Sequence, residues 1–215
     1  MKNPSFAVGE YYHIYNRGVD KRSVFSDADD VDRFLLSLDE FNQEESIGSI
    51  YEHLFIKGDR ETVQLGNPIP KLVDIISFCL NGNHFHLLLK QNKDGGISKF
   101  MQKVGIGYTN YFNEKNKRSG ALFQGKFKAK HIDSNEYLLR VGVYINLNNM
   151  LGYKKEELSV SSWNQLLGEE KGFCVGYDVV VGQFKNRKSL EVFAEEVLAD
   201  IKRNKLLQAE RVFLD

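Results

Sequence analysis

The chain has 215 residues, of which 42% are hydrophobic and 27% are charged, with 29 basic residues against 29 acidic ones. This length suits one domain with an extension, and no apolar run approaches the ~20 residues that a membrane-spanning helix needs. The composition excludes an integral membrane protein of the helical kind. Counted over the whole chain, a net charge of zero also argues against a nucleic-acid partner.

The start of the chain and its cysteines bear on the cellular compartment. The first residues lack a basic segment followed by an apolar one, so we expect no secretory signal. Only Cys79 and Cys174 are present, which gives no disulfide framework and suits a reducing environment. We therefore expect a cytoplasmic protein with no membrane partner.

The first half of the chain predicts strands and one helix. Residues 11–16 alternate as a strand does, and residues 27–41 place apolar side chains at helical spacing behind an acidic first turn. Residues 50–56 and 71–80 are strand-like. An Asn-Gly pair follows the second of these strands, which predicts a tight antiparallel hairpin with residues 84–90.

The second half predicts further helices around one more strand. Residues 97–111 have a helical period, and residues 122–132 return to alternation. A capping-box pattern at Asp133 opens a helix that runs to about Leu151, and residues 190–201 form a last amphipathic helix. This order predicts an α+β fold, with a ferredoxin-like antiparallel sheet, helices on one face, and a C-terminal helical extension.

The segment Asn83-His84-Phe85-His86 carries the most informative pattern. Alternate side chains of a strand point to the same face, so His84 and His86 should lie roughly 6–7 Å apart on one side of the sheet. Two imidazoles in this arrangement can hold a divalent metal. The same pattern also fits two hydrogen-bonded histidines in a half-buried strand.

A second pattern lies on the helix predicted to begin near Asp133. Tyr137, Val141, Tyr144 and Asn148 fall at i, i+4, i+7 and i+11, which places them in one stripe. A stripe with tyrosine and asparagine is not ordinary core packing. It presents a phenol and an amide oxygen one turn apart on the same face.

Charges are unevenly distributed along the chain. Residues 102–131 hold seven basic residues and one acid, whereas residues 27–45 hold eight acids and one arginine, so we expect a polarised molecule. Basic residues interleaved with aromatic ones are typical of surfaces that bind single-stranded nucleic acid, although a solvated basic face gives the same pattern. The candidate DNA contacts are Lys103, Lys115, Lys117, Arg118, Lys126, Lys128 and Lys130.

Together these features describe phosphoryl transfer with a tyrosine nucleophile. A tyrosine hydroxyl with a pKa of ~10 is a weak nucleophile, so attack on a phosphodiester needs positioning and a metal that polarises the phosphate. Two imidazoles and an amide oxygen suit Mg²⁺ less well than an all-oxygen site does, and Mn²⁺ tolerates histidine better.

Five ordered blocks between about residues 10 and 168 resemble one known family. They are YYHIYNRG at 11–18, NHFH at 83–86, YTNYFN at 108–113, GALFQGKFK at 120–128, and YLL at 137–139 leading to YINLN at 144–148. In these blocks the chain resembles the single-tyrosine HUH transposases, and most closely the REP-associated tyrosine transposases.

This resemblance implies a ferredoxin-like fold, binding of single-stranded hairpin DNA, and cleavage through a 5′-phosphotyrosine with a free 3′-hydroxyl. It matches His84 and His86 to metal ligands, Asn148 to the third ligand and Tyr144 to the nucleophile. The family usually has proline directly after the residue matching Asn148, whereas this chain has Asn149. We expect this departure to shift the end of the helix without removing a catalytic group.

The sequence thus predicts a metal-dependent DNA transposase that nicks and rejoins single strands with Mg²⁺ or Mn²⁺. We expect a catalytic domain over residues 1–155 and an extension over residues 156–215, and the extension favours a monomer over a homodimer. Two alternatives remain, a domesticated protein that binds hairpin DNA without cleaving it and a metallohydrolase that uses the H-x-H pair.

Other tyrosines and histidines fit ordinary structural roles better. Tyr108 and Tyr111 lie on an amphipathic helix and are expected to be core or base-stacking residues. His13, His53 and His131 lack a partner at ligand spacing, so each is expected to be a surface or sheet histidine.

Overall fold

The computed structural model describes residues 3–50, 70–151 and 158–212, with only the backbone described for residues 205–212. Its centre is a five-stranded antiparallel sheet in the order β4-β1-β3-β2-β5. The strands are β1 (Tyr11–Arg17), β2 (Val73–Asn81), β3 (His84–Gln91), β4 (Lys128–Ile132) and β5 (Val160–Ser161).

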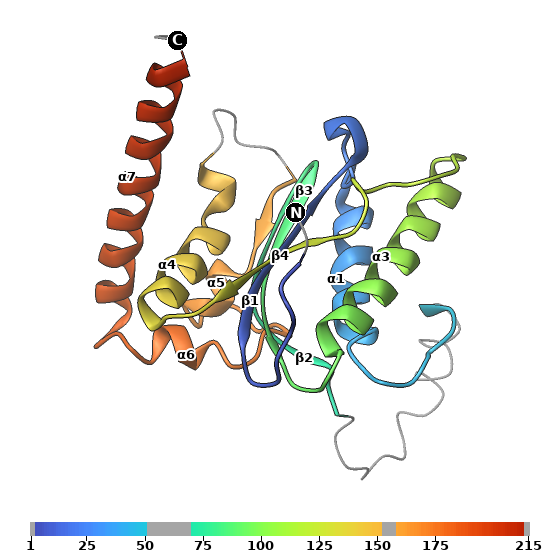
Figure 1. Cartoon of the computed structure of the whole chain (residues 1–215), viewed down its shortest axis with the longest axis horizontal. Helices are drawn as coiled ribbons and strands as arrows, with labels where there is room; N and C mark the ends of the chain where they lie inside the picture. Colours follow the sequence, from blue (N-terminus) through green and yellow to red (C-terminus); the bar gives the residue numbers. More distant parts are fainter. Residues whose placement is uncertain (1–2, 51–69, 152–157, 213–215) are drawn as a thin grey trace.

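Helices cover both faces of this sheet (Figure 1). Helices α1 and α3 lie side by side on one face, and α4 lies on the other face with α7 packed against it. The α-helices are α1 (Ala28–Glu40), α3 (Gly96–Lys115), α4 (Asn135–Asn146), α5 (Trp163–Leu166), α6 (Asp178–Val181) and α7 (Arg187–Val212), and the 3₁₀ helices are η1 (Val19–Lys21) and η2 (Asn148–Met150).

The chain order β1-α1-β2-β3-α3-β4 with the strand order β4-β1-β3-β2 is the ferredoxin-like arrangement that the sequence predicts. Both helices of this unit lie on one face, as expected. Because α4 covers the opposite face, the central strands are buried on both sides. This explains why Leu87, Leu88 and Leu89 run consecutively instead of alternating with polar residues.

The predicted hairpin is confirmed. Strands β2 and β3 pair antiparallel with Asn81 opposite His84, so that only Gly82 and Asn83 form the turn. This tight connection places the side chain of Asn81 beside that of His84, because paired residues of an antiparallel ladder project to the same face.

Helix α4 differs at both ends from the sequence prediction. Its N-cap is Ser134, whose hydroxyl accepts a hydrogen bond from the backbone N–H of Tyr137, so the helix begins one residue later than a cap at Asp133 would require. It ends at Asn146 and not near Leu151. Asn148 therefore lies on η2, a tighter turn that follows the helix.

The predicted strand over residues 122–132 is also shorter. Strand β4 begins at Lys128, and Gly125 adopts a φ of 71°, which a regular strand does not allow. Lys126 thus precedes the strand and does not share a strand face with Lys128 and Lys130. The predicted strand over residues 50–56 lies, from residue 51 on, outside the described residues.

The C-terminal segment completes the core on the α4 side. Strand β5 pairs with β2, and Val143 and Leu147 pack in one apolar cluster with Leu190 and Val197 of α7. Among the helices of the described ranges, none combines the length and apolarity that crossing a bilayer requires.

Candidate active site

His84 and His86 project from β3 toward the face of the sheet that α4 covers. Their ring centroids lie 5.2 Å apart at an interplanar angle of 89°, so the structure brings the H-x-H pair together on one face. His86 is 8% exposed, and His84, near the end of the strand, is half-buried. Tyr15 of β1 pairs with His86, and its ring stacks on the imidazole with a centroid separation of 5.9 Å.

The imidazole of His84 is held in a defined orientation. Its Nδ1 lies 2.6 Å from Oδ1 of Asn83, and because an amide oxygen only accepts, Nδ1 carries the hydrogen. Its Nε2 therefore has an available lone pair, and it lies 3.3 Å from Oδ1 of Asn148. A histidine that donates from one ring nitrogen and offers the other is the usual arrangement of a metal ligand.

Asn81 stands between these two acceptor atoms. Its Nδ2 donates to Oδ1 of Asn148 at 2.9 Å and lies 3.1 Å from Nε2 of His84. One hydrogen-bond donor thus occupies the position from which a cation would contact both acceptors. The donor set fits a divalent metal, provided that this amide moves aside when the metal binds. No motif in the sequence marks Asn81, although the Asn-Gly hairpin places it opposite His84.

His86 has a histidine partner of its own. Nε2 of His13 lies 2.8 Å from Nδ1 of His86, and the two rings are 5.1 Å apart. The expectation that His13 has no partner at ligand spacing is therefore wrong, because β1 runs beside β3 and aligns the two side chains on one face. When Nδ1 of His86 donates to His13, Nε2 of His86 has its lone pair available for a metal.

Both buried histidines are neutral at neutral pH. Burial, together with the nearby charge of Lys130, lowers the pKa of His13 to about 4. Burial also holds the pKa of His86 well below its usual value, with contributions from His13 and His84. A metal site built on these groups needs no deprotonation near pH 7.

Tyr144 of α4 lies directly over the histidines. Its ring centroid is 5.7 Å from that of His86 and 5.9 Å from that of His13, both edge to face. Burial raises the pKa of Tyr144, and the hydrogen bond with Asn148 partly offsets this effect. The hydroxyl therefore carries its proton at neutral pH and lies next to the amide that faces His84.

The rival tyrosines lie on the opposite face of the sheet. Tyr108 is fully buried between α1 and α3, and its hydroxyl donates to the backbone oxygen of Val24. The Tyr111 hydroxyl donates to Oδ1 of Asp30 at 3.1 Å. Both have the structural role that the sequence predicts.

The candidate metal ligands near Tyr144 include an amide as well as imidazoles. Within residues 3–50, 70–151 and 158–204, no three His, Cys, Asp or Glu side chains gather closely enough to hold a metal. The candidate ligands are thus two imidazoles and the oxygen of Asn148. Such a nitrogen-rich set favours Mn²⁺ over Mg²⁺, which prefers oxygen ligands.

The charge polarity that the sequence predicts is partly offset in the fold. Helix α1, which carries most of the acidic residues, packs beside α3, which carries Lys103 and Lys115. Lys115 bridges Asp27 at 2.6 Å and the fully buried Asp30 at 2.8 Å. The ammonium of Lys103 donates to backbone oxygens in residues 43–45. Two of the seven basic residues predicted to contact DNA therefore join α3 to α1 and to the segment that follows α1.

The remaining basic residues fall into two groups. Arg118 donates to the side chain of Asn113 and the backbone oxygen of Ala121, which fixes the loop after α3. The other four side chains are exposed, and one of them, Lys130, has its ammonium 4.6 Å from the ring centroid of Tyr137. These exposed residues are Lys117, Lys126, Lys128 and Lys130.

Residues 70–148, which hold His84, His86, Tyr144 and Asn148, match the family model described as "Transposase IS200 like". Over these residues the chain is similar to the IS200-like transposases. A solved structure described as a REP-associated tyrosine transposase bound to a REP hairpin has a similar fold. It is 12% identical in sequence, with 82% of this chain and 91% of that chain covered and a TM-score of 0.50. The comparison with curated proteins gave no match.

Proposed function

We propose that this protein is a metal-dependent transposase that binds hairpin DNA, nicks a single strand through Tyr144 and rejoins strands. One observation carries the proposal: the Tyr144 ring lies 5.7 Å from that of His86, and the amide oxygen of Asn148 lies 3.3 Å from Nε2 of His84. The candidate nucleophile and the candidate ligands are thus neighbours in one site. The hairpin in the solved relative supports DNA of this form as the substrate.

The proposed reaction is an in-line displacement at phosphorus. The phenolic oxygen of Tyr144 forms a bond to the scissile phosphorus, the bond from phosphorus to the 3′-oxygen breaks, and the phenolic proton is lost as the 3′-hydroxyl is formed. A divalent cation bound by His84, His86 and Asn148 would neutralise charge on the non-bridging phosphate oxygens. Attack of a 3′-hydroxyl on the phosphotyrosine reverses the step and rejoins the strands.

We also propose that the active site is formed within one chain and that the protein acts as a monomer. Tyr144 already lies over His86 of its own chain, and α7 packs on the outer side of α4. In this proposal residues 1–155 carry the chemistry and residues 156–215 support α4. A cytoplasmic location suits the two free, buried cysteines, Cys79 and Cys174.

The test is the isolation of a covalent adduct. Hairpin DNA labelled at its 3′ end is incubated with the protein and Mn²⁺, and the labelled peptide is identified by mass spectrometry. We expect a phosphotyrosine on the peptide that contains Tyr144 and a free 3′-hydroxyl on the released fragment. Binding without any adduct would favour the alternative of a hairpin-DNA-binding protein that does not cleave.

A further inference from the structure

The motif Asn16-Arg17-Gly18 ends β1 beside the candidate active site, and two of its residues have clear structural roles. The side-chain amide of Asn16 donates to the backbone oxygen of Gly125 at 3.2 Å. A Cβ at Gly18 would clash with the backbone oxygen of Arg22, so packing explains the glycine. Arg17 is exposed, and within the described residues its guanidinium makes no hydrogen bond or ion pair. The fold therefore gives this side chain no structural role.

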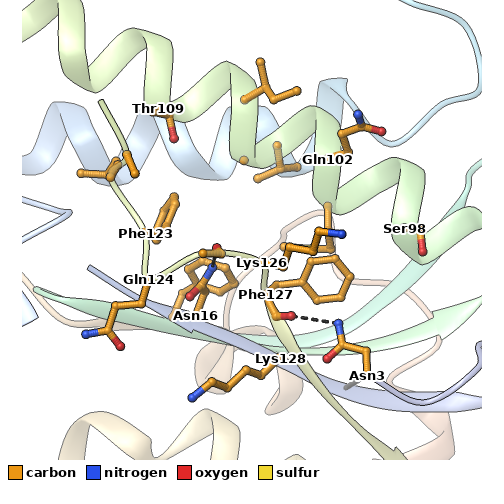
Figure 2. A pocket seen from close by; sticks show the side chains of 18 of the residues that line it. Asn3, Asn16, Ser98, Gln102, Thr109, Phe123, Gln124, Lys126, Phe127 and Lys128 are labelled. Atoms are coloured by element: carbon orange, nitrogen blue, oxygen red, sulfur yellow. Dashed lines mark hydrogen bonds between the residues drawn. The ribbon is translucent and has the colours of Figure 1, made fainter. Parts of the chain in front are cut away.

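Strand pairing places Arg17 on the same face of the sheet as the candidate metal ligands. In the β1–β3 ladder Tyr15 is opposite His86, and Arg17 is opposite His84. Directly opposed residues of an antiparallel pair project to one face, with their Cβ atoms roughly 4.5–5.5 Å apart. The neighbouring Asn16 projects to the other face, into a pocket that α3 borders (Figure 2). Arg17 therefore extends from the face that carries the histidines, beside His84.

The backbone of Arg17 is held on both sides. Its N–H donates to Oδ1 of Asn16 at 2.9 Å, and its carbonyl oxygen accepts from the N–H of Gln124 at 2.8 Å. The N–H of Gly18 donates to the backbone oxygen of Asn83, in the β2–β3 turn, at 2.9 Å. These bonds tie the end of β1 to the turn that precedes the histidines. They fix the base of the Arg17 side chain relative to the site, as a group that stabilises a transition state requires.

A guanidinium in this place suits a phosphate of the DNA backbone. It is planar, stays protonated and can give two parallel hydrogen bonds to the non-bridging oxygens of one phosphate. Asp20, an acid close to Arg17 in the chain, pairs with Arg22 instead, at 3.5 Å. Tyr144 reaches the same face of the sheet from α4, with its ring over that of His86. A scissile phosphate attacked by Tyr144 near these histidines has a cation beside it on β1.

We propose that Arg17 is a catalytic residue that contacts the scissile phosphate, with its guanidinium bonded to the non-bridging oxygens. Its positive charge stabilises the charge on these oxygens in the transition state, and it transfers no proton. The inference rests on the proposed function, because it assigns a further group to the same reaction.

The first test is a cycle of binding measurements in EDTA, so that the DNA stays intact. The hairpin DNA has either an ordinary phosphate or an uncharged methylphosphonate at the linkage that the adduct experiment maps. We expect the methylphosphonate to weaken binding by the parent protein about tenfold, as the loss of one charge-assisted pair does. Arg17→Gln should bind the ordinary DNA about tenfold more weakly than the parent, and the methylphosphonate should cause it no further loss.

Arg22→Gln is the matched control, because Arg22 is an exposed arginine of the same segment that pairs with Asp20. It should bind both DNAs as the parent does. The proposal fails if the methylphosphonate does not weaken binding by the parent, or if the two losses add in Arg17→Gln. If the parent neither binds hairpin DNA nor yields an adduct, the proposed function fails, and this inference fails with it.

A second test separates contact with the phosphate from support of His84. At saturating DNA and Mn²⁺ the nicking rate should fall about a hundredfold in Arg17→Gln. Arg17→Lys keeps the charge without the paired bonds and should recover about tenfold of this loss. Because the side chain is exposed, both variants should keep the melting temperature and the Mn²⁺ affinity of the parent. Nicking at the parent rate, or a loss of Mn²⁺ affinity like that of His84→Ala, would overturn the assignment.

Discussion

Nε2 of His13 lies 2.8 Å from Nδ1 of His86, so a histidine of β1 directly supports a candidate metal ligand on β3. Both side chains are almost fully buried, and no acidic partner is required to hold them. The hydrogen bond requires that the accepting imidazole be neutral, and burial favours the neutral form of both rings.

Stability should therefore fall in mild acid. The pKa of His13 is lowered to about 4 by burial, from an ordinary value of 6.5, so the unfolded chain binds a proton more readily than the folded protein. The stabilisation is complete above about pH 6.5 and is lost as the pH falls toward 4. His13→Gln, which does not titrate, should reduce the drop in unfolding free energy between pH 7 and pH 4.5 by about 2 kcal/mol. Urea unfolding at both values measures this effect, and equal drops in the two proteins would contradict it.

Tyr144→Phe should abolish nicking and leave DNA affinity unchanged. The hydroxyl performs the proposed chemistry, whereas the ring packs against the histidines and remains in the variant. We expect a loss of more than about a thousandfold in nicking rate, as removal of a nucleophile causes. Tyr111→Phe, which removes a hydroxyl on the far side of the sheet, is the matched control. Nicking by the Tyr144 variant at the parent rate would refute the central proposal.

His84→Ala, His86→Ala and Asn148→Ala should each weaken Mn²⁺ binding by at least about tenfold, because a three-ligand site loses both affinity and geometry with one ligand. Titration calorimetry measures this without relying on activity. His131→Ala, at a half-exposed histidine outside the site, should bind Mn²⁺ as the parent does. If the three site variants also bind Mn²⁺ as tightly as the parent does, the histidines serve only to pack the sheet.

Ser162→Ala should destabilise the fold. The Ser162 hydroxyl donates to Oδ1 of Asn146 at 2.7 Å and accepts from the backbone N–H of Phe78 at 2.9 Å, in a fully buried position. Its loss leaves both groups unpaired and should cost about 1–3 kcal/mol in urea unfolding. Ser161→Ala, at the half-buried neighbouring position, should change stability by less than about 0.5 kcal/mol. Similar values for the two variants would mean that the Ser162 bonds do not secure the end of α4.

The basic residues should separate into two classes. Replacement of Lys126, Lys128 and Lys130 by glutamine should reduce the slope of log affinity against log salt concentration by about two units, at ~0.7 per phosphate contact. Lys115→Gln should instead lower the free energy of unfolding by about 1–3 kcal/mol, because it leaves buried Asp30 without its ammonium partner. Binding assays at several salt concentrations and urea unfolding distinguish the classes. An unchanged slope in the triple variant would move the DNA path away from β4.

The sequence by itself determined the parts of this protein that depend on local spacing. Strand alternation placed His84 and His86 on one face, and the Asn-Gly pair predicted the β2–β3 hairpin. Helical spacing placed Tyr137, Val141 and Tyr144 in one stripe of α4. These predictions succeeded because each needs only the geometry of one element or one tight turn. The same local patterns were enough to predict the ferredoxin-like order of elements.

Only the tertiary structure decided which distant residues meet. It placed His13 beside His86 because β1 pairs with β3, and it brought Lys103 and Lys115 of α3 against the acidic α1 region, which partly offsets the predicted polarity. It also ended α4 at Asn146, where the Asn146 side chain bonds a serine far along the chain. Such contacts follow from strand order and helix packing, which bring together residues that have no fixed spacing in the sequence.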